Sequence, residues 1–154
     1  MSAYEPWDLC VELDICVRRI ALADTWGAWI PQHQAIVLAR GLNPVQERCV
    51  LAHQAEHALA NHTVSCGLGP FADQPHVQAA LSPMARRQDR HATIEAARKL
   101  IPLSELAATL RARARSVTEA AFHLRVTPDV LCTRIADLQK EGWPWRLDKS
   151  KIAG

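Results

Sequence analysis

The pattern of apolar and polar residues divides the chain into an extended first part and a helical remainder. A short alternation of apolar and acidic residues at 7–14 suits a helix that begins after Pro6. Three runs rich in β-branched and aromatic residues follow at 17–21, 26–30 and 35–38, separated by Asp, Gly and Pro positions that favour turns. These runs predict a small antiparallel three-stranded sheet.

Helical spacing begins at a segment that we expect to organise the fold. Asn43 is a candidate N-cap, Pro44 suits the first helical position, and the stretch 49–62 contains neither glycine nor proline. Apolar residues surround its two histidines on nearly every side, which indicates a helix buried in a small domain. Helical pattern resumes after a glycine- and proline-containing loop at 63–76 and is strongest at 85–101, just before a proline.

The two histidines of this segment, His53 and His57, stand four residues apart. Because an α-helix turns about 100° per residue, the two imidazoles lie about 40° apart on one face. This is how a helix offers two nitrogens to one zinc ion. The alternative is a pair of core histidines that are satisfied by hydrogen bonds.

The second predicted helix carries the candidates for a third ligand, which zinc bound by two histidines usually takes. The candidates are Asp89, His91 and Glu95. On a helical wheel Asp89 shares a stripe with small and apolar residues, whereas His91 and Glu95 point to the far side. Since a buried carboxylate is destabilising unless it is paired or bound to metal, Asp89 is the predicted ligand, with a salt bridge to an arginine as the alternative. Thr93 lies on the same face and is a candidate hydrogen-bond partner for a ligand.

Length and composition indicate one ordinary domain with an apolar core. The chain has 154 residues and a formal net charge of +2, which gives little electrostatic support for nucleic-acid binding. Five cysteines are an odd number without a CxxC pair, and no signal peptide or long apolar run is visible. We therefore expect buried thiols, a reducing cytoplasm and no membrane role.

These features resemble the ImmA/IrrE family of zinc metallopeptidases. The resemblance rests on LAHQAEHALANH at 51–62 and on the sequence AARKLIP that ends the second helix, and it spans about 9–138. It implies a zincin-like fold, a Zn2+ cofactor, and His53 and His57 as ligands, with Asp89 at the acidic position of the second helix. It also implies a protein substrate, a helix-turn-helix repressor of a prophage or mobile element that is cleaved to relieve repression.

Two positions depart from the family pattern. Gln54 stands where Glu directly follows the first histidine, and Thr93 stands where Asp or Asn is usual. An amide has no useful basicity, so Gln54 can orient a water molecule but cannot accept its proton. Glu56 flanks the histidine pair on the opposite side and completes an H-x-x-E-H order, and we predict that it acts as the catalytic base. The interpretation is a zinc-dependent endopeptidase; the alternative is a catalytically inert zinc-binding protein that regulates by holding a partner.

The last third of the chain carries amphipathic helical patterns at 103–112, 118–124 and 128–139. The spacing of apolar residues in the last two resembles a helix-turn-helix unit. Its second helix has little of the basic character that phosphate contacts need. The polar side chains that it offers are Asp129, Thr133, Arg134 and Asp137. A DNA-binding regulator with structural histidines is therefore a further alternative, and a protein partner could occupy the same segment.

The predicted organisation is an α+β zincin-like domain at 1–102, a helical appendage at 103–140 and a tail at 141–154. In this tail we expect Trp143 and Trp145 to pack back on the body of the protein.

Overall fold

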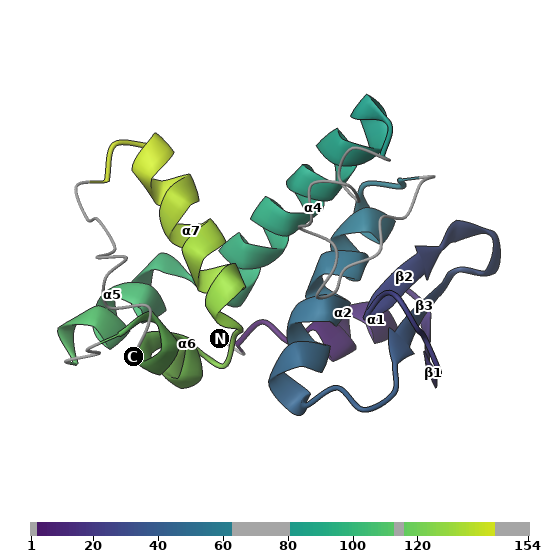
Figure 1. Ribbon diagram of the computed structural model, residues 1–154, viewed down its shortest axis with the longest axis horizontal. Coiled ribbons are helices and arrows are strands. Elements are labelled where there is room, and N and C mark those ends of the chain that lie inside the picture. The colour runs from purple at the N-terminus through teal and green to yellow at the C-terminus, as the bar shows by residue number, and fades with distance from the viewer. Residues whose placement is uncertain (1–2, 63–80, 113–115, 144–154) are drawn as a thin grey trace.

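The computed structural model describes residues 3–62, 81–112 and 116–143, and its fold is α+β as predicted. A three-stranded sheet lies at one end, the C-terminal helices lie at the other, and α2 and α4 run between them (Figure 1). The elements in chain order are α1 (Pro6–Glu12), β1 (Cys16–Ile20), β2 (Gly27–Ile30), a 3-10 turn (Pro31–His33), β3 (Ala35–Ala39), α2 (Pro44–Leu59), α4 (Pro83–Leu100), α5 (Leu103–Arg111), α6 (Val117–Leu124) and α7 (Pro128–Lys140).

The sheet is mixed, so the prediction of an antiparallel sheet was wrong for one of its two pairings. Strands β2 and β3 form the expected antiparallel hairpin, but β3 pairs with β1 in parallel, giving the order β1-β3-β2. The reason lies in burial: β3 is nearly all buried and takes the centre, whereas β1 is mostly exposed and lies at an edge. Apolar alternation gives strand positions but not their order.

Helix α2 begins as predicted and contains the longest run of buried residues in the described part of the chain. The Asn43 side chain accepts a hydrogen bond from the Gln46 backbone N–H at 2.8 Å, and the Gln46 side chain accepts one from Asn43 N–H at 3.0 Å. This reciprocal capping box, with Pro44 at the first position, fixes the start of the helix. The ten consecutive residues from Arg48 to His57 are all buried, because α2 packs against the sheet on one side and against α4 on the other.

Two hydrophobic clusters meet on α2. Val50, Leu51 and Ala55 belong to the cluster beneath the sheet, whereas Cys49 and Ala52 belong to the cluster formed with the C-terminal helices. That second cluster continues from α4 into α5, α6 and α7, across the predicted boundary between 1–102 and 103–140. The division into two domains stays a prediction.

Gly27 lets the edge strand β2 approach α2 closely. A Cβ atom added there would lie 2.6 Å from a side-chain carbon of Val50 and 3.1 Å from the carbonyl oxygen of Val37. A larger residue would therefore push the strand away from α2.

Helices α6 and α7 form the predicted helix-turn-helix-like pair, but its polar residues serve the interior. Arg134 and Asp137 are buried, and Arg134 Nε donates to the carbonyl oxygen of Ile101 at 2.9 Å. Asp137 accepts hydrogen bonds from Nε and Nη2 of Arg98, both at 2.8 Å. Two of the four positions proposed to read DNA thus hold α7 on α4, and DNA contact stays a prediction.

The cysteines are not uniformly buried as predicted. Cys10 and Cys49 are buried and Cys132 is partly buried, but Cys16 is exposed because it begins the edge strand β1. All four are free thiols. Cys66 lies outside the described residues, as do the loop at 63–76 and Trp145. Trp143 does pack against the helical core, as expected.

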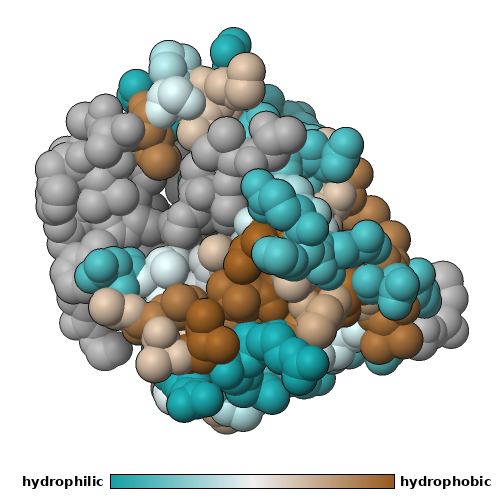
Figure 2. Space-filling view, turned by 90° about the vertical axis from the view of Figure 1, so that its right-hand side faces the viewer, coloured by the Kyte–Doolittle hydropathy of each residue, from teal (hydrophilic) through white to brown (hydrophobic). Residues whose placement is uncertain are grey.

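The surface on the sheet side is mixed in character. Hydrophobic residues gather near the centre of this face, and hydrophilic residues lie around them (Figure 2). Among residues 3–62, 81–112 and 116–143, no helix combines the length and apolarity that crossing a bilayer would need.

Candidate metal centre

The face of α2 that meets α4 presents both predicted histidine ligands. His53 Nε2 and His57 Nε2 lie 3.1 Å apart, and both side chains are almost completely buried. The rings stand edge to face, with centroids 4.9 Å apart. The i, i+4 spacing therefore brings two imidazole nitrogens to one point, as the helical wheel predicted.

Helix α4 brings Asp89 to the same point. Its Oδ1 lies 3.1 Å from His53 Nε2. The two other candidates lie elsewhere: His91 is exposed and Glu95 pairs with Arg98 at 2.9 Å. Helix α4 carries three candidate ligands, and of these only Asp89 clusters with His53 and His57.

The three side chains fit a divalent metal ion. Their ligand atoms all lie within 4.8 Å of one another. A tetrahedral zinc with ligand bonds of about 2.0–2.1 Å requires ligand atoms roughly 3.3 Å apart, close to the two distances of 3.1 Å. Asp89 Oδ1 is buried, and it meets His53 Nε2 at 3.1 Å with no further hydrogen-bond partner among the described residues. Because His53 Nε2 carries at most one hydrogen, it cannot make full hydrogen bonds to both His57 and Asp89, whereas a cation bound to all three groups would satisfy them together.

Two further side chains orient the imidazoles from behind. Thr93 Oγ1 lies 3.3 Å from His53 Nδ1, as expected for a hydrogen-bond partner of a ligand. His62 Nδ1 lies 2.9 Å from His57 Nδ1. Burial, followed by repulsion from His53 and His62, lowers the pKa of His57 to about 3. His57 is therefore a neutral imidazole at neutral pH, which is the form that binds metal.

His62 is a functional contact that the sequence reasoning missed. Helix α2 ends at Leu59, earlier than the predicted 62, and Asn61 adopts a left-handed conformation with φ of 54°. The His62 and Asn61 N–H groups then donate to the carbonyl oxygens of His57 and Ala58 at 3.0 and 3.1 Å, as in a Schellman motif. The sequence did contain a signal for this contact. An asparagine after the apolar run can adopt the left-handed conformation that ends a helix and turns the next residue back over its last turn.

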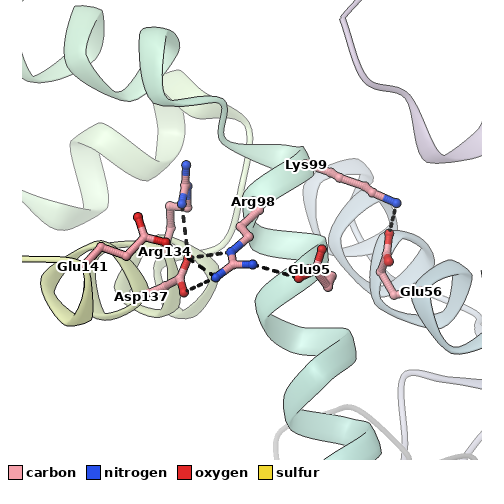
Figure 3. Close-up of polar contacts among 7 residues, drawn as sticks. All are labelled: Glu56, Glu95, Arg98, Lys99, Arg134, Asp137 and Glu141. Atoms are coloured by element: carbon pink, nitrogen blue, oxygen red, sulfur yellow. Dashed lines mark hydrogen bonds and ion pairs between the residues drawn. The ribbon is translucent and has the colours of Figure 1, made fainter. Parts of the chain in front are cut away.

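The two flanking residues, Gln54 and Glu56, face different surroundings. Gln54 is fully buried, and its Nε2 donates to the carbonyl oxygen of Gly27 on β2 at 3.4 Å. Glu56 is also buried, and its Oε1 lies 2.6 Å from Lys99 Nζ on α4 (Figure 3). Burial raises the pKa of Tyr4, and the negative charge of Glu56 adds to that effect. The role of Glu56 as a base stays a prediction, and sequence reasoning did not identify its partner Lys99.

Comparison with known proteins agrees with this site. A family model described as the IrrE N-terminal-like domain, peptidase M78, matches residues 10–136 and so includes both histidines and Asp89. No curated protein matches the chain significantly. The resemblance to ImmA/IrrE proteins is confirmed by the family match, which covers most of the 154 residues. The chain belongs to the peptidase M78 family of proteins with an IrrE N-terminal-like domain.

Proposed function

We propose that this protein is a zinc-binding member of the peptidase family that acts by holding a protein partner and has little or no hydrolytic activity. The observation that carries the zinc site is the convergence of His53, His57 and Asp89, with two ligand-atom distances of 3.1 Å. The family resemblance suggests a helix-turn-helix repressor of a prophage or mobile element as the partner.

The donor set supports zinc among divalent metals. Two neutral imidazoles and one carboxylate are common zinc ligands, and three protein ligands leave a fourth position open. A bound zinc ion supplies Lewis acidity, which activates water and polarises a carbonyl group. His62 and Thr93 would hold the imidazoles in orientation for this ion.

The surroundings of Gln54 and Glu56 support weak or absent hydrolysis. A peptidase needs a group that accepts a proton, and loss of a general base typically lowers the rate by about 10² to 10⁴. Gln54 occupies the family position of that base, and an amide cannot accept the proton. The Glu56 carboxylate is paired with Lys99 Nζ at 2.6 Å, and this contact directs it towards α4.

An active zinc endopeptidase is the second candidate, and one observation favours it. Glu56 is a buried carboxylate on the helix that carries both histidines, one residue before His57. Release of Glu56 from Lys99, whose side chain is 36% exposed, would make the carboxylate available as a base.

Cleavage of helix-turn-helix repressors from the same host tests the two candidates against each other. For the non-hydrolytic protein we expect no cleavage by the wild type and a gain with Gln54→Glu, which restores the family sequence. For the endopeptidase we expect cleavage by the wild type that falls by about 10² to 10⁴ with Glu56→Gln and changes much less with Gln54→Ala. Zinc content measured on every variant ensures that the comparison concerns the base and not the metal.

A further inference from the structure

A groove of about 330 Å³ lies between α4 and α7 and shares two residues, Asp89 and Thr93, with the candidate metal centre. One wall is a stripe of α4, and the other is a stripe of α7. The residues that line the groove are Arg86, Asp89, Arg90, Thr93 and Ile94 on α4, and Thr133, Ala136, Asp137 and Lys140 on α7. Both stripes follow the i, i+3, i+4 spacing of a single helix face.

Apart from Arg87, which is exposed outside the groove, the lysines and arginines of these two helices fall into two groups. Arg98, Arg134 and Lys99 are bound to carboxylates within the protein. Arg86, Arg90 and Lys140 are exposed, line the groove and form no ion pair with any residue in the described ranges. The groove therefore has three available positive charges at its rim.

The carboxylates in the groove leave this positive charge uncompensated. Asp137 is paired with Arg98 and Arg134, and hydrogen bonds from Arg98 lower the pKa of the Asp137 carboxyl below its usual range. Asp89 points to His53. Ile94 and Ala136 add apolar surface to the walls.

We propose that this groove binds an acidic segment of a protein partner, in which carboxylate side chains alternate with apolar ones. The carboxylates pair with Arg86, Arg90 and Lys140, and the apolar side chains contact Ile94 and Ala136. A peptide fits these surroundings better than a nucleic acid, since Ile94 and Ala136 offer contacts to apolar side chains but none to a continuous phosphate backbone, which the net charge of +2 attracts little.

The walls of the groove are fixed before any partner binds. Arg98 bridges α4 and α7 through two hydrogen bonds of 2.8 Å to Asp137, and Arg134 Nη1 lies 3.2 Å from the same carboxylate (Figure 3). Since the angle between the two helices is held by this contact, binding does not have to order the walls. This inference rests on the proposed function, because it names the chemistry of the protein partner that would be held next to the zinc site.

Fluorescence anisotropy with a labelled decapeptide of alternating glutamate and leucine tests the groove. We expect binding that weakens about ten-fold or more in the variant Arg86→Glu/Arg90→Glu, and again in Lys140→Glu on the opposite wall, because like charges then face each other. The matched control is Arg87→Glu/Arg40→Glu, which changes net charge equally at exposed positions outside the groove and should stay within about two-fold of wild type. An equal loss in the control would overturn the proposal.

Two further probes define the specificity. The same peptide with glutamine in place of glutamate should bind about ten-fold more weakly, as expected when charge-assisted contacts are removed. A labelled ten-nucleotide oligothymidine that binds more tightly than the acidic peptide, and loses affinity in the same groove variants, would instead make this a nucleic-acid site.

Metal binding separates this inference from the proposed function. Arg86→Glu/Arg90→Glu should keep zinc, and His53→Ala should lose zinc but keep the peptide. A wild-type protein that binds zinc but not the acidic peptide overturns the groove proposal alone. Peptide binding by a protein that takes up no zinc overturns the proposed zinc function alone.

Discussion

Helix α4 takes part in two polar clusters that differ in how their charges are paired. Towards α7, the Asp137 carboxylate receives hydrogen bonds from two arginines, Arg98 and Arg134. Towards α2, Asp89 Oδ1 lies 3.1 Å from His53 Nε2, which in turn lies 3.1 Å from His57 Nε2. The first cluster pairs its charges within the protein, whereas the second brings together three ligand atoms that a metal ion could bind.

This difference separates a structural contact from a functional one. Buried polar groups are nearly always satisfied, so a set of ligand atoms that converge without a partner calls for an explanation outside the protein. The Arg98–Asp137 contact has its explanation in the joining of α4 to α7. The His53, His57 and Asp89 set could hold a metal ion, which would supply that explanation.

The largest expected effect is the loss of zinc binding when one of the proposed ligands, His53, His57 or Asp89, is replaced. We expect about one zinc per wild-type chain, in line with sites of this kind, and none after His53→Ala. Asp89→Ala should weaken zinc binding far more than His91→Ala, because His91 is exposed and outside the ligand set. Elemental analysis after zinc reconstitution and dialysis measures the content.

A thermal-shift measurement provides the control for these variants. Zinc should raise the unfolding temperature of wild type and of His91→Ala, and leave that of His53→Ala unchanged. Equal loss of zinc in Asp89→Ala and His91→Ala would mean that α4 is rotated from the orientation described here.

The second largest effect should be a loss of stability, without a loss of zinc, when Asp137 no longer pairs with Arg98 and Arg134. Asp137→Ala leaves the buried Arg134 without its carboxylate partner, and breaking such a pair lowers the free energy of unfolding by about 3 kcal/mol. Asp129→Ala, at an exposed position of the same helix, is the control and should change it by less than about 0.5 kcal/mol. Urea denaturation measures both, and zinc affinity should stay that of wild type. A loss of zinc in Asp137→Ala would show that the two clusters are coupled through α4.

Sequence reasoning was most successful for features set by local geometry. The start of α2 follows from Asn43 and Pro44, and the convergence of His53, His57 and Asp89 follows from the spacing of the histidines and the inward face of Asp89. The order of the strands could not be predicted, since β3 takes the central position through burial against α2, a tertiary effect. The exposure of Cys16 follows from the same strand order.

Contacts between distant helices were the part of the site that the sequence left open. Glu56 was predicted to flank the histidine pair, but nothing local indicates that Lys99 reaches it from α4. Arg134 and Asp137 looked like exposed positions of a reading helix, and their burial depends on how α7 packs on α4. A helical wheel describes one helix and cannot identify which neighbour covers a face.

A smaller effect is expected from the side chains behind the ligands. His62→Ala and Thr93→Val should each keep the ligand set but weaken zinc binding about 10- to 100-fold, because the imidazoles lose the contacts that orient them. Competition with a chelating dye measures the affinity. His123→Ala, at an exposed position on α6, is a matched histidine control and should leave it unchanged. Unchanged affinity in both variants would mean that α2 alone orients the rings.

The smallest expected effect is a pH dependence of stability that arises from the Asp137 carboxyl. Hydrogen bonds from Arg98 lower the pKa of Asp137 below its ordinary value. A carboxyl whose pKa is lower in the folded state stabilises the fold at pH values above its unfolded pKa of about 3.9, and this contribution is lost as the pH falls through the folded value. The stability gap between wild type and Asp137→Ala should therefore be constant near neutral pH and become narrower below about pH 4. The comparison is made on metal-free protein, since zinc binding has its own pH dependence. A gap that stays constant into the acid range would show that Asp137 stabilises the helix pair by packing and not by its charge.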